Sequence, residues 1–69
     1  MKLYFTVSDI VSATKFNEGI NRLGFHAEFE PKYGRFAFEE QEDLIDELEM
    51  ALTNICDEYN VNGYFEAEC

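Results

Sequence analysis

The stretch FHAEFEPKYGRFAFE, residues 25 to 39, decides the fold of this chain. Apolar and polar residues alternate on both sides of a central PKYG, and this period of two is typical of half-buried strands. Pro31 and Gly34 favour a tight turn between the two runs. The stretch therefore predicts a β-hairpin. The side chains expected on its inner face are Phe25, Ala27, Phe29, Phe36 and Phe38.

Two further strands are expected at the ends of the sequence. KLYFTV, residues 2 to 7, alternates in the same way and predicts a first strand. YFEAE, residues 64 to 68, predicts a last strand that is entered through an Asn62-Gly63 turn. The residues expected on the inner face of these strands are Leu3, Phe5, Val7, Phe65 and Ala67.

Two stretches have the periodicity of amphipathic helices. The first begins at a capping residue, Ser8 or Asp9, and ends at Gly24. The second runs from about Gln41 to Tyr59. The expected buried residues are Ala13, Phe16, Ile20 and Leu23 in the first helix, with Ile10 at its edge, and Leu44, Ile45, Leu48, Ala51, Leu52, Ile55 and Tyr59 in the second.

The element order is therefore βαββαβ, which predicts an α+β, ferredoxin-like fold in one domain spanning residues 1 to 69. Right-handed crossovers give a four-stranded antiparallel sheet in the order 4-1-3-2, with both helices on one face. The other face is expected to be open to solvent. Its predicted residues are Lys2, Tyr4, Thr6, His26, Glu28, Glu30, Arg35, Ala37, Glu39, Tyr64, Glu66 and Glu68.

Two ferredoxin-like families are similar to this chain in size or topology only. The small heavy-metal-binding domains need a Cys-x-x-Cys after the first strand, where this chain has VSDIVS, residues 7 to 12. RNA-recognition domains stack bases on aromatic residues of the central strands, and only Tyr4 occupies such a place here. Neither soft-metal transport nor RNA binding is therefore expected.

The charge is concentrated in the second half of the sequence. The net charge is −10, and residues 1 to 35 hold five bases and four acids, giving +1. Residues 36 to 69 hold eleven acids and no base, giving −11. Such a field repels nucleic acid and anionic membranes and attracts basic surfaces. Direct binding to nucleic acid or to a membrane is therefore not expected.

Few residues suggest chemistry at a catalytic or metal site. His26 and Glu28 lie two residues apart on one predicted strand and are the only candidate acid–base pair. The acids lack the spacing of a calcium loop, so no cofactor and no specific metal site is predicted. Cys56 is expected to be a buried free thiol and Cys69 an exposed one. With no signal-peptide core or membrane-spanning run, we expect a cytoplasmic, non-enzymatic protein.

The second predicted helix carries the most informative pattern. Its outer face holds seven acids along about 27 Å, roughly one every 4 Å, near the 3.4 Å between phosphates of a DNA strand. Met50 stands among these acids, on the solvent side. The pattern predicts a surface that binds a partner. Its expected residues are Glu39, Glu40, Glu42, Asp43, Asp46, Glu47, Glu49, Met50, Tyr64 and Glu66.

Two hypotheses for function follow from this surface. The first is an inhibitor or decoy that mimics nucleic acid and binds a basic nucleic-acid-binding protein or nuclease complex. In size and charge, though not in any motif, the chain resembles small acidic proteins of phages and mobile elements, including anti-CRISPR and anti-restriction proteins. The second is a structural or regulatory module that forms a homodimer through the open sheet face, burying Tyr4, Ala37 and Tyr64.

Overall fold

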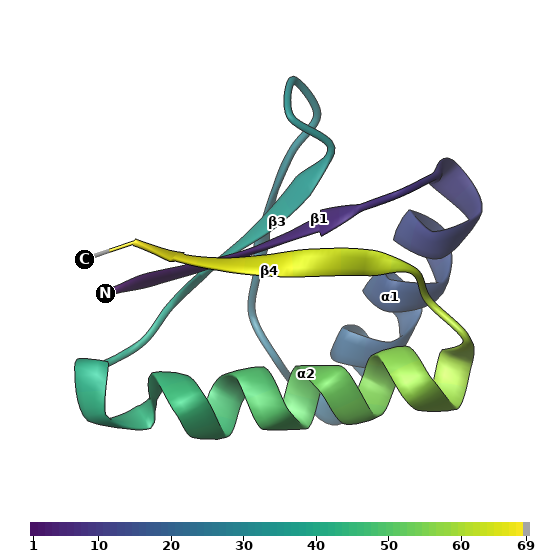
Figure 1. The fold of residues 1–69 in the computed structure, drawn as a ribbon. Helices are drawn as coiled ribbons and strands as arrows, with labels where there is room; N and C mark the ends of the chain where they lie inside the picture. Colours follow the sequence, from purple (N-terminus) through teal and green to yellow (C-terminus); the bar gives the residue numbers. More distant parts are fainter. Residues whose placement is uncertain (69) are drawn as a thin grey trace.

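The predicted element order is confirmed in a computed structural model that describes residues 1–68 (Figure 1). The elements are β1 (Lys2–Val7), α1 (Ile10–Leu23), β2 (Glu28–Glu30), β3 (Arg35–Glu39), a 3₁₀ turn η1 (Glu42–Leu44), α2 (Ile45–Tyr59) and β4 (Gly63–Glu68). The tip of the β2–β3 hairpin projects from the sheet, and α2 runs along the sheet beneath β4. The β-hairpin, on which the predicted fold depends most, is therefore present.

The four strands form one antiparallel sheet in the order β2-β3-β1-β4. This is the predicted order 4-1-3-2, counted from the opposite edge. The two helices pack on the same face of the sheet, since both contribute side chains to a single core with β1 and β3. The fold is therefore ferredoxin-like, and one sheet face is left without helices.

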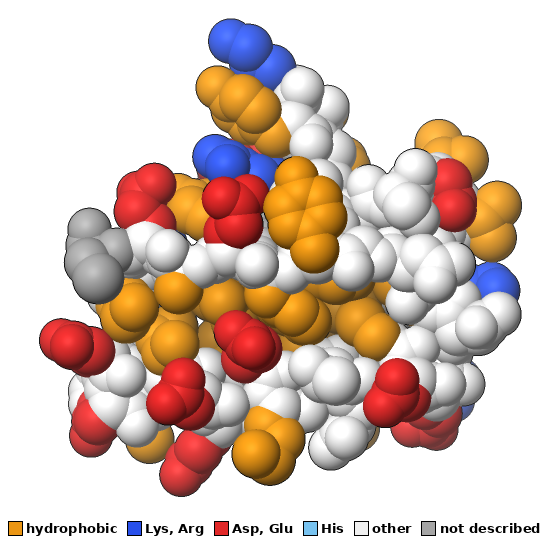
Figure 2. All heavy atoms as spheres, in the orientation of Figure 1, with side chains coloured by type: hydrophobic (Ala, Val, Ile, Leu, Met, Phe, Trp, Pro, Cys, Tyr) orange, Lys and Arg blue, Asp and Glu red, His pale blue; other side chains and the backbone are white. Residues whose placement is uncertain are grey.

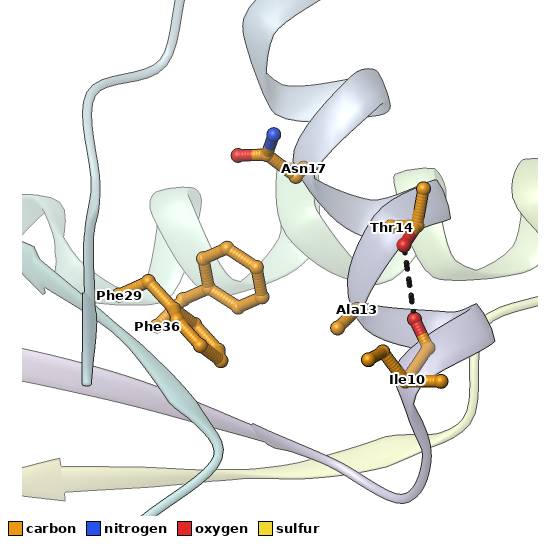
Figure 3. Close-up of a pocket in the computed structure, with 6 residues that line it drawn as sticks. All are labelled: Ile10, Ala13, Thr14, Asn17, Phe29 and Phe36. Carbon is orange, nitrogen blue, oxygen red and sulfur yellow. Dashed lines mark hydrogen bonds between the residues drawn. The ribbon is translucent and has the colours of Figure 1, made fainter. Parts of the chain in front are cut away.

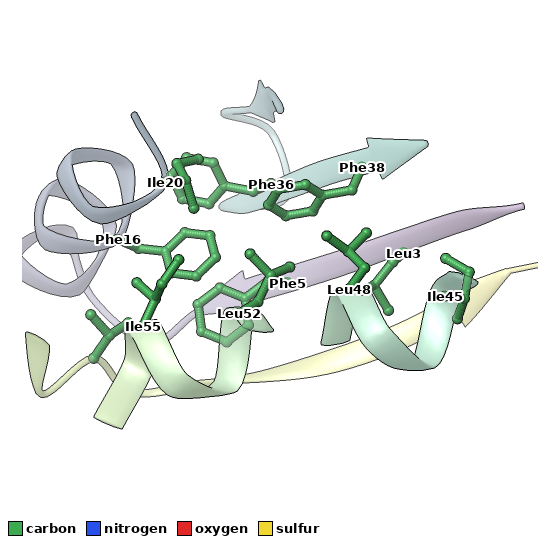
Figure 4. Packing of buried hydrophobic residues seen from close by; sticks show 11 residues of the cluster. Leu3, Phe5, Phe16, Ile20, Phe36, Phe38, Ile45, Leu48, Leu52 and Ile55 are labelled. Atoms are coloured by element: carbon green, nitrogen blue, oxygen red, sulfur yellow. The ribbon is translucent and has the colours of Figure 1, made fainter. Parts of the chain in front are cut away.

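The core lies between the sheet and the two helices (Figure 4). Phe16 of α1 is fully buried at its centre, with its ring centroid 4.4 Å from that of Phe5 and 5.0 Å from that of Phe36. Tilted rings at such distances add to the stabilisation that comes from burial alone. The remaining core residues shown in Figure 4 are Leu3, Ile20, Phe38, Ile45, Leu48, Leu52 and Ile55.

The ends of α1 explain why the second strand is shorter than predicted. The Ser12 N–H donates to the Asp9 carboxylate at 2.7 Å, and this bond lowers the pKa of Asp9. At the other end Gly24 adopts φ 81°, and the Phe25 N–H donates back to the Ile20 carbonyl at 2.9 Å. Phe25 thus belongs to the helix terminus. The predicted strand over residues 25 to 30 is reduced to Glu28–Glu30.

The second helical segment starts and ends with special geometry. Its first turn is the 3₁₀ turn η1, and Leu44 is 37% exposed rather than buried as predicted, because it precedes the regular helix. Asn60 ends the segment in the left-handed conformation, at φ 57°. Gly63, predicted as a turn residue, instead begins β4. A side chain at this position would collide with the backbone of β1, since its Cβ atom would lie only 2.3 Å from the Thr6 carbonyl oxygen.

Three further residues predicted to be buried are exposed, Ile10 at the edge of the predicted face is 82% exposed, and Ser12 and Val61 are buried although they were not predicted to be. Leu23 lies in the last turn of α1, beyond the reach of the sheet, and is 61% exposed. Phe29 sits on the short edge strand and Ala67 near the end of the other edge strand, so both are exposed. Val61, in the loop before β4, is buried against the core. Periodicity gives no signal for a single loop residue of this kind.

Neither helix of residues 1–68 combines the length and the apolar composition that a membrane span requires.

Candidate interaction surface

The outer face of α2 and η1 presents the carboxylates that the sequence singled out. Burial of Ile45, Leu48, Leu52 and Ile55 against the core fixes the rotation of the helix. The acidic residues on the opposite side are therefore directed to solvent. We refer to these exposed residues as the α2 acidic face: Glu42, Asp43, Asp46, Glu47, Glu49, Asp57 and Glu58. Figure 2 shows carboxylates spread along this helix.

The α2 acidic face has no basic partner among the described residues. The two ion pairs of residues 1–68 join Arg22 to Glu18 on α1 and Arg35 to Glu30 on the hairpin. All five bases of the sequence lie in residues 1 to 35. Charges of one sign three and four residues apart on a helix repel one another. The carboxylates of this face are therefore not neutralised by the fold.

Met50 lies on the same side of α2 and is 68% exposed, as predicted. The preceding acids of the first helical turn suit the positive end of the helix dipole. Asp57 and Glu58 lie near the negative end, where carboxylates are unfavourable. The acidic face is thus not fully explained by helix stability.

Glu40 and Glu47 both line a small apolar depression beside α2. Its volume is 210 Å³, and the Glu40 carboxylate accepts the Gln41 N–H at 2.9 Å. Two carboxylates over an apolar floor suit the aliphatic stem and charged head of a lysine or arginine. The lining residues are Phe25, Glu40, Leu44, Glu47, Leu48 and Ala51.

Three of the predicted partner-binding residues lie elsewhere. Glu39 belongs to β3, and Tyr64 and Glu66 belong to β4. All three project from the sheet face that has no helices, because Phe38, next to Glu39, is buried in the core, and the ring of Phe65, between Tyr64 and Glu66, packs 4.7 Å from that of Phe5 on the core side. The sheet separates that face from the α2 acidic face. The ten predicted residues are therefore divided between two surfaces.

The open sheet face carries an arrangement that the sequence analysis missed. The Arg35 guanidinium lies 3.9 Å from the ring centroid of Tyr4 and 4.4 Å from that of Tyr33, and its Nε donates to Glu30 at 2.5 Å. The Glu30 carboxylate raises the pKa of Arg35. Tyr4 was expected to be exposed on this face, but it is only 6% exposed because Arg35 covers it. Arg35 pairs with Thr6, two residues from Tyr4, so Tyr4 and Arg35 are diagonal neighbours on the same face of adjacent strands, which is the signal that was available.

A second hollow lies between α1 and the hairpin (Figure 3). It has a volume of 380 Å³ and is lined by Ile10, Ala13, Thr14, Asn17, Phe29 and Phe36. The Thr14 hydroxyl donates to the Ile10 carbonyl at 3.0 Å, so it is already paired. No titratable side chain is among these lining residues. The hollow can accept an apolar group, but it offers no acid or base for catalysis.

The predicted pair of His26 and Glu28 is not built as a catalytic pair. His26 is exposed and precedes β2, so the two residues do not share a strand, and no hydrogen bond joins them within residues 1–68. In the same range, no group of three metal-ligating side chains converges. Cys56 is a half-buried free thiol, and burial raises its pKa to about 11. Cys69 lies outside the described residues.

Searches against protein-family models, curated proteins and solved structures find no match to this chain.

Proposed function

We propose that this protein is a non-enzymatic inhibitor or decoy whose α2 acidic face occupies the basic nucleic-acid channel of a target protein. One observation carries the proposal: every carboxylate of this face is exposed, and none has a basic partner within residues 1–68. Charge that the fold does not neutralise is available to a partner. Binding then releases the mutual repulsion that the free protein carries.

The spacing of the charges supports nucleic acid as the ligand that is imitated. Residues 42 to 59 form a continuous helical segment. At about 1.5 Å per residue this segment is about 27 Å long, so its seven acids average roughly one every 4 Å, with five in residues 42 to 49 and two at positions 57 and 58. Phosphates of one DNA strand follow one another at about 3.4 Å. A row of lysine or arginine side chains that binds phosphates can therefore contact the carboxylates of this helix.

Two features add contacts that charge alone does not give. Met50 offers an exposed apolar side chain within the acidic face. The depression between Glu40 and Glu47 provides an apolar floor for the stem of one basic side chain. Apolar contact surrounded by charge is typical of protein interfaces, where it provides affinity while the charges steer association. The target is expected to be a nucleic-acid-binding protein or a nuclease complex.

Capture from a cell lysate tests the proposal. The wild-type protein and the variant E42K/D46K/E49K are immobilised, and bound proteins are eluted with increasing salt. We expect the wild type alone to capture a nucleic-acid-binding protein, because the variant replaces three phosphate-like charges by bases. Added DNA or RNA should compete with capture. Circular dichroism of the variant should retain the helical signal.

Two results would count against this function. Capture of the same partner by both proteins would show that the α2 acidic face is not the contact. Capture that nucleic acid does not compete would show that the target's nucleic-acid channel is not occupied. The second hypothesis, a homodimer through the open sheet face, gains no support from Tyr4, since Arg35 covers this residue within one chain.

A further inference from the structure

The outer edge of β4 has free hydrogen-bonding groups. In the β1–β4 ladder the Ser8 N–H donates to the Asn62 carbonyl at 3.1 Å. Paired residues of an antiparallel ladder alternate between bonded and non-bonded positions. The N–H and C=O groups of Gly63, Phe65 and Ala67 are therefore directed away from β1. No strand of residues 1–68 lies on that side.

The two edges of the sheet differ in length. β2 consists of three residues, whereas β4 consists of six. Short strands, proline and charged side chains, lysine above all, protect sheet edges from unwanted pairing. β4 is long and contains neither proline nor lysine. Its only charges are Glu66 and Glu68, so the edge is closed to acidic strands and open to basic ones.

The two sides of β4 offer different surroundings to an added strand. On the open sheet face, Tyr64, Glu66 and Glu68 are exposed. On the helix side, Figure 2 shows an apolar band between β4 and α2, with carboxylates on both sides of the band. Half-buried Phe65 belongs to the helix side of β4, because it packs on Phe5.

Cys56 lies on the flank of α2 that adjoins this band. Ala51 lines the depression beside Phe25, on the flank of α2 near the end of α1. At about 100° per residue, Cys56 is about 140° further round the helix and so faces the opposite flank, toward β4. Its side chain is half-buried and packs against the core. Glu49, seven residues before Cys56, lies within about 20° of it, so the α2 wall of the band carries an apolar side chain and a carboxylate side by side.

We infer that the β4 edge binds an extended segment of a partner protein in which basic and apolar residues alternate. Side chains of such a segment project alternately to the two faces. One set would lie beside Glu66 and Glu68 on the open sheet face, and the other on the apolar band. A second copy of this chain is a poorer partner, because both β4 edges would carry Glu66 and Glu68 on the same sheet face and neither would supply a base.

This inference rests on the proposed function for the basic character of the partner, but it uses the main-chain groups of the β4 edge rather than the carboxylates of the α2 acidic face. A target that presents both a phosphate-binding groove and a basic edge segment would contact the protein at both places. The β4 contact can be measured without any nucleic-acid-binding protein. The two proposals can therefore fail separately.

The test uses a short acetylated and amidated peptide that alternates valine and lysine, observed by NMR on the isotope-labelled protein. We expect hydrogen exchange to slow at the amides of Gly63, Phe65 and Ala67, which are free in the unbound protein. A peptide of the same composition, with all valines before all lysines, should bind more weakly. It has the same charge but cannot satisfy both faces of the added strand.

Two variants at one position separate strand addition from charge attraction. A67P removes an N–H that points away from the sheet and leaves the β1–β4 bonds in place. A67S keeps that N–H. We expect A67P to weaken peptide binding about tenfold relative to A67S, as for the loss of one or two main-chain hydrogen bonds. Amide spectra of both variants should show the native fold.

Any of four outcomes would overturn the inference. These are no binding of the alternating peptide at millimolar concentration, equal binding by A67P and A67S, exchange protection at α2 instead of β4, and protection of the β4 amides in a peptide-free dimer. Loss of peptide binding leaves the lysate capture unaffected, so the decoy function keeps its own test.

Discussion

The open sheet face and the α2 acidic face both carry carboxylates, but in different surroundings. On the sheet, Glu30 is paired with Arg35, and Lys2 stands in register between Glu39 and Glu68. Among the described residues, no base lies within ion-pairing distance of a carboxylate of α2. On the first face the Glu30–Arg35 pair contributes to the folded chain, whereas Glu66 and Glu68 have no ion-pair partner among the described residues. Charge on the second has no ion-pair partner among the described residues, which is the basis of the proposed function.

The largest expected effect on stability comes from removing Arg35 from the open sheet face. R35A removes the group that covers Tyr4 and pairs with Glu30, so we expect the midpoint of thermal unfolding to fall by several degrees. R35K keeps the charge but loses the planar stacking, so its midpoint of thermal unfolding should lie between those of R35A and the wild type. An unchanged midpoint for R35A would show that this face is not organised by Arg35.

A smaller effect is expected at Cys56, on the flank of α2 toward β4. Burial raises the pKa of this thiol from 9.0 to about 11, so the folded state holds the proton more tightly than the unfolded state. The stability due to the neutral thiol is complete below pH 9 and is lost as the pH rises from about 9 to 11. Urea unfolding within and below this pH window measures the effect. The free energy of unfolding should fall more steeply with rising pH for the wild type than for C56A. The variant C69A is the control, and it should behave as the wild type.

The smallest expected effect comes from single charges of the α2 acidic face. E58K replaces an acid near the negative end of the helix, and we expect the free energy of unfolding to rise by about 0.3–1 kcal/mol at low salt. E42K makes the same change of charge at the positive end and should lower it. High salt should reduce both differences. Equal effects of the two variants would mean that net charge alone, and not position on the helix, determines stability.

The strands, helices and sheet order could be predicted because their patterns repeat. Alternation in residues 2 to 7 and 35 to 39, and the apolar stripe of α2, follow directly from burial on one side. The edges were less predictable, as the exposure of Phe29 and Ala67 shows. An alternating pattern predicts the sheet face on which a side chain lies, but it does not predict whether another element covers that side chain.

The candidate site could be predicted in part for a similar reason. Exposure of the acidic residues and of Met50 follows from helical rotation, which the apolar periodicity predicts. The separation of Glu66 from the α2 acidic face depends on sheet pleating and on the position of the helix layer. The cover that Arg35 places on Tyr4 depends on the conformation of a long side chain. Neither can be read from local periodicity.

The central claim is that the α2 acidic face, and not negative charge in general, binds the target. Two charge-matched variants test it against the captured partner: D46K/E49K on α2 and E18K/E28K away from it, each changing the net charge by +4, from −10 to −6. We expect D46K/E49K to weaken binding about a hundredfold and to reduce its dependence on salt. E18K/E28K should bind within a few-fold of the wild type. Equal weakening by both variants would contradict the account.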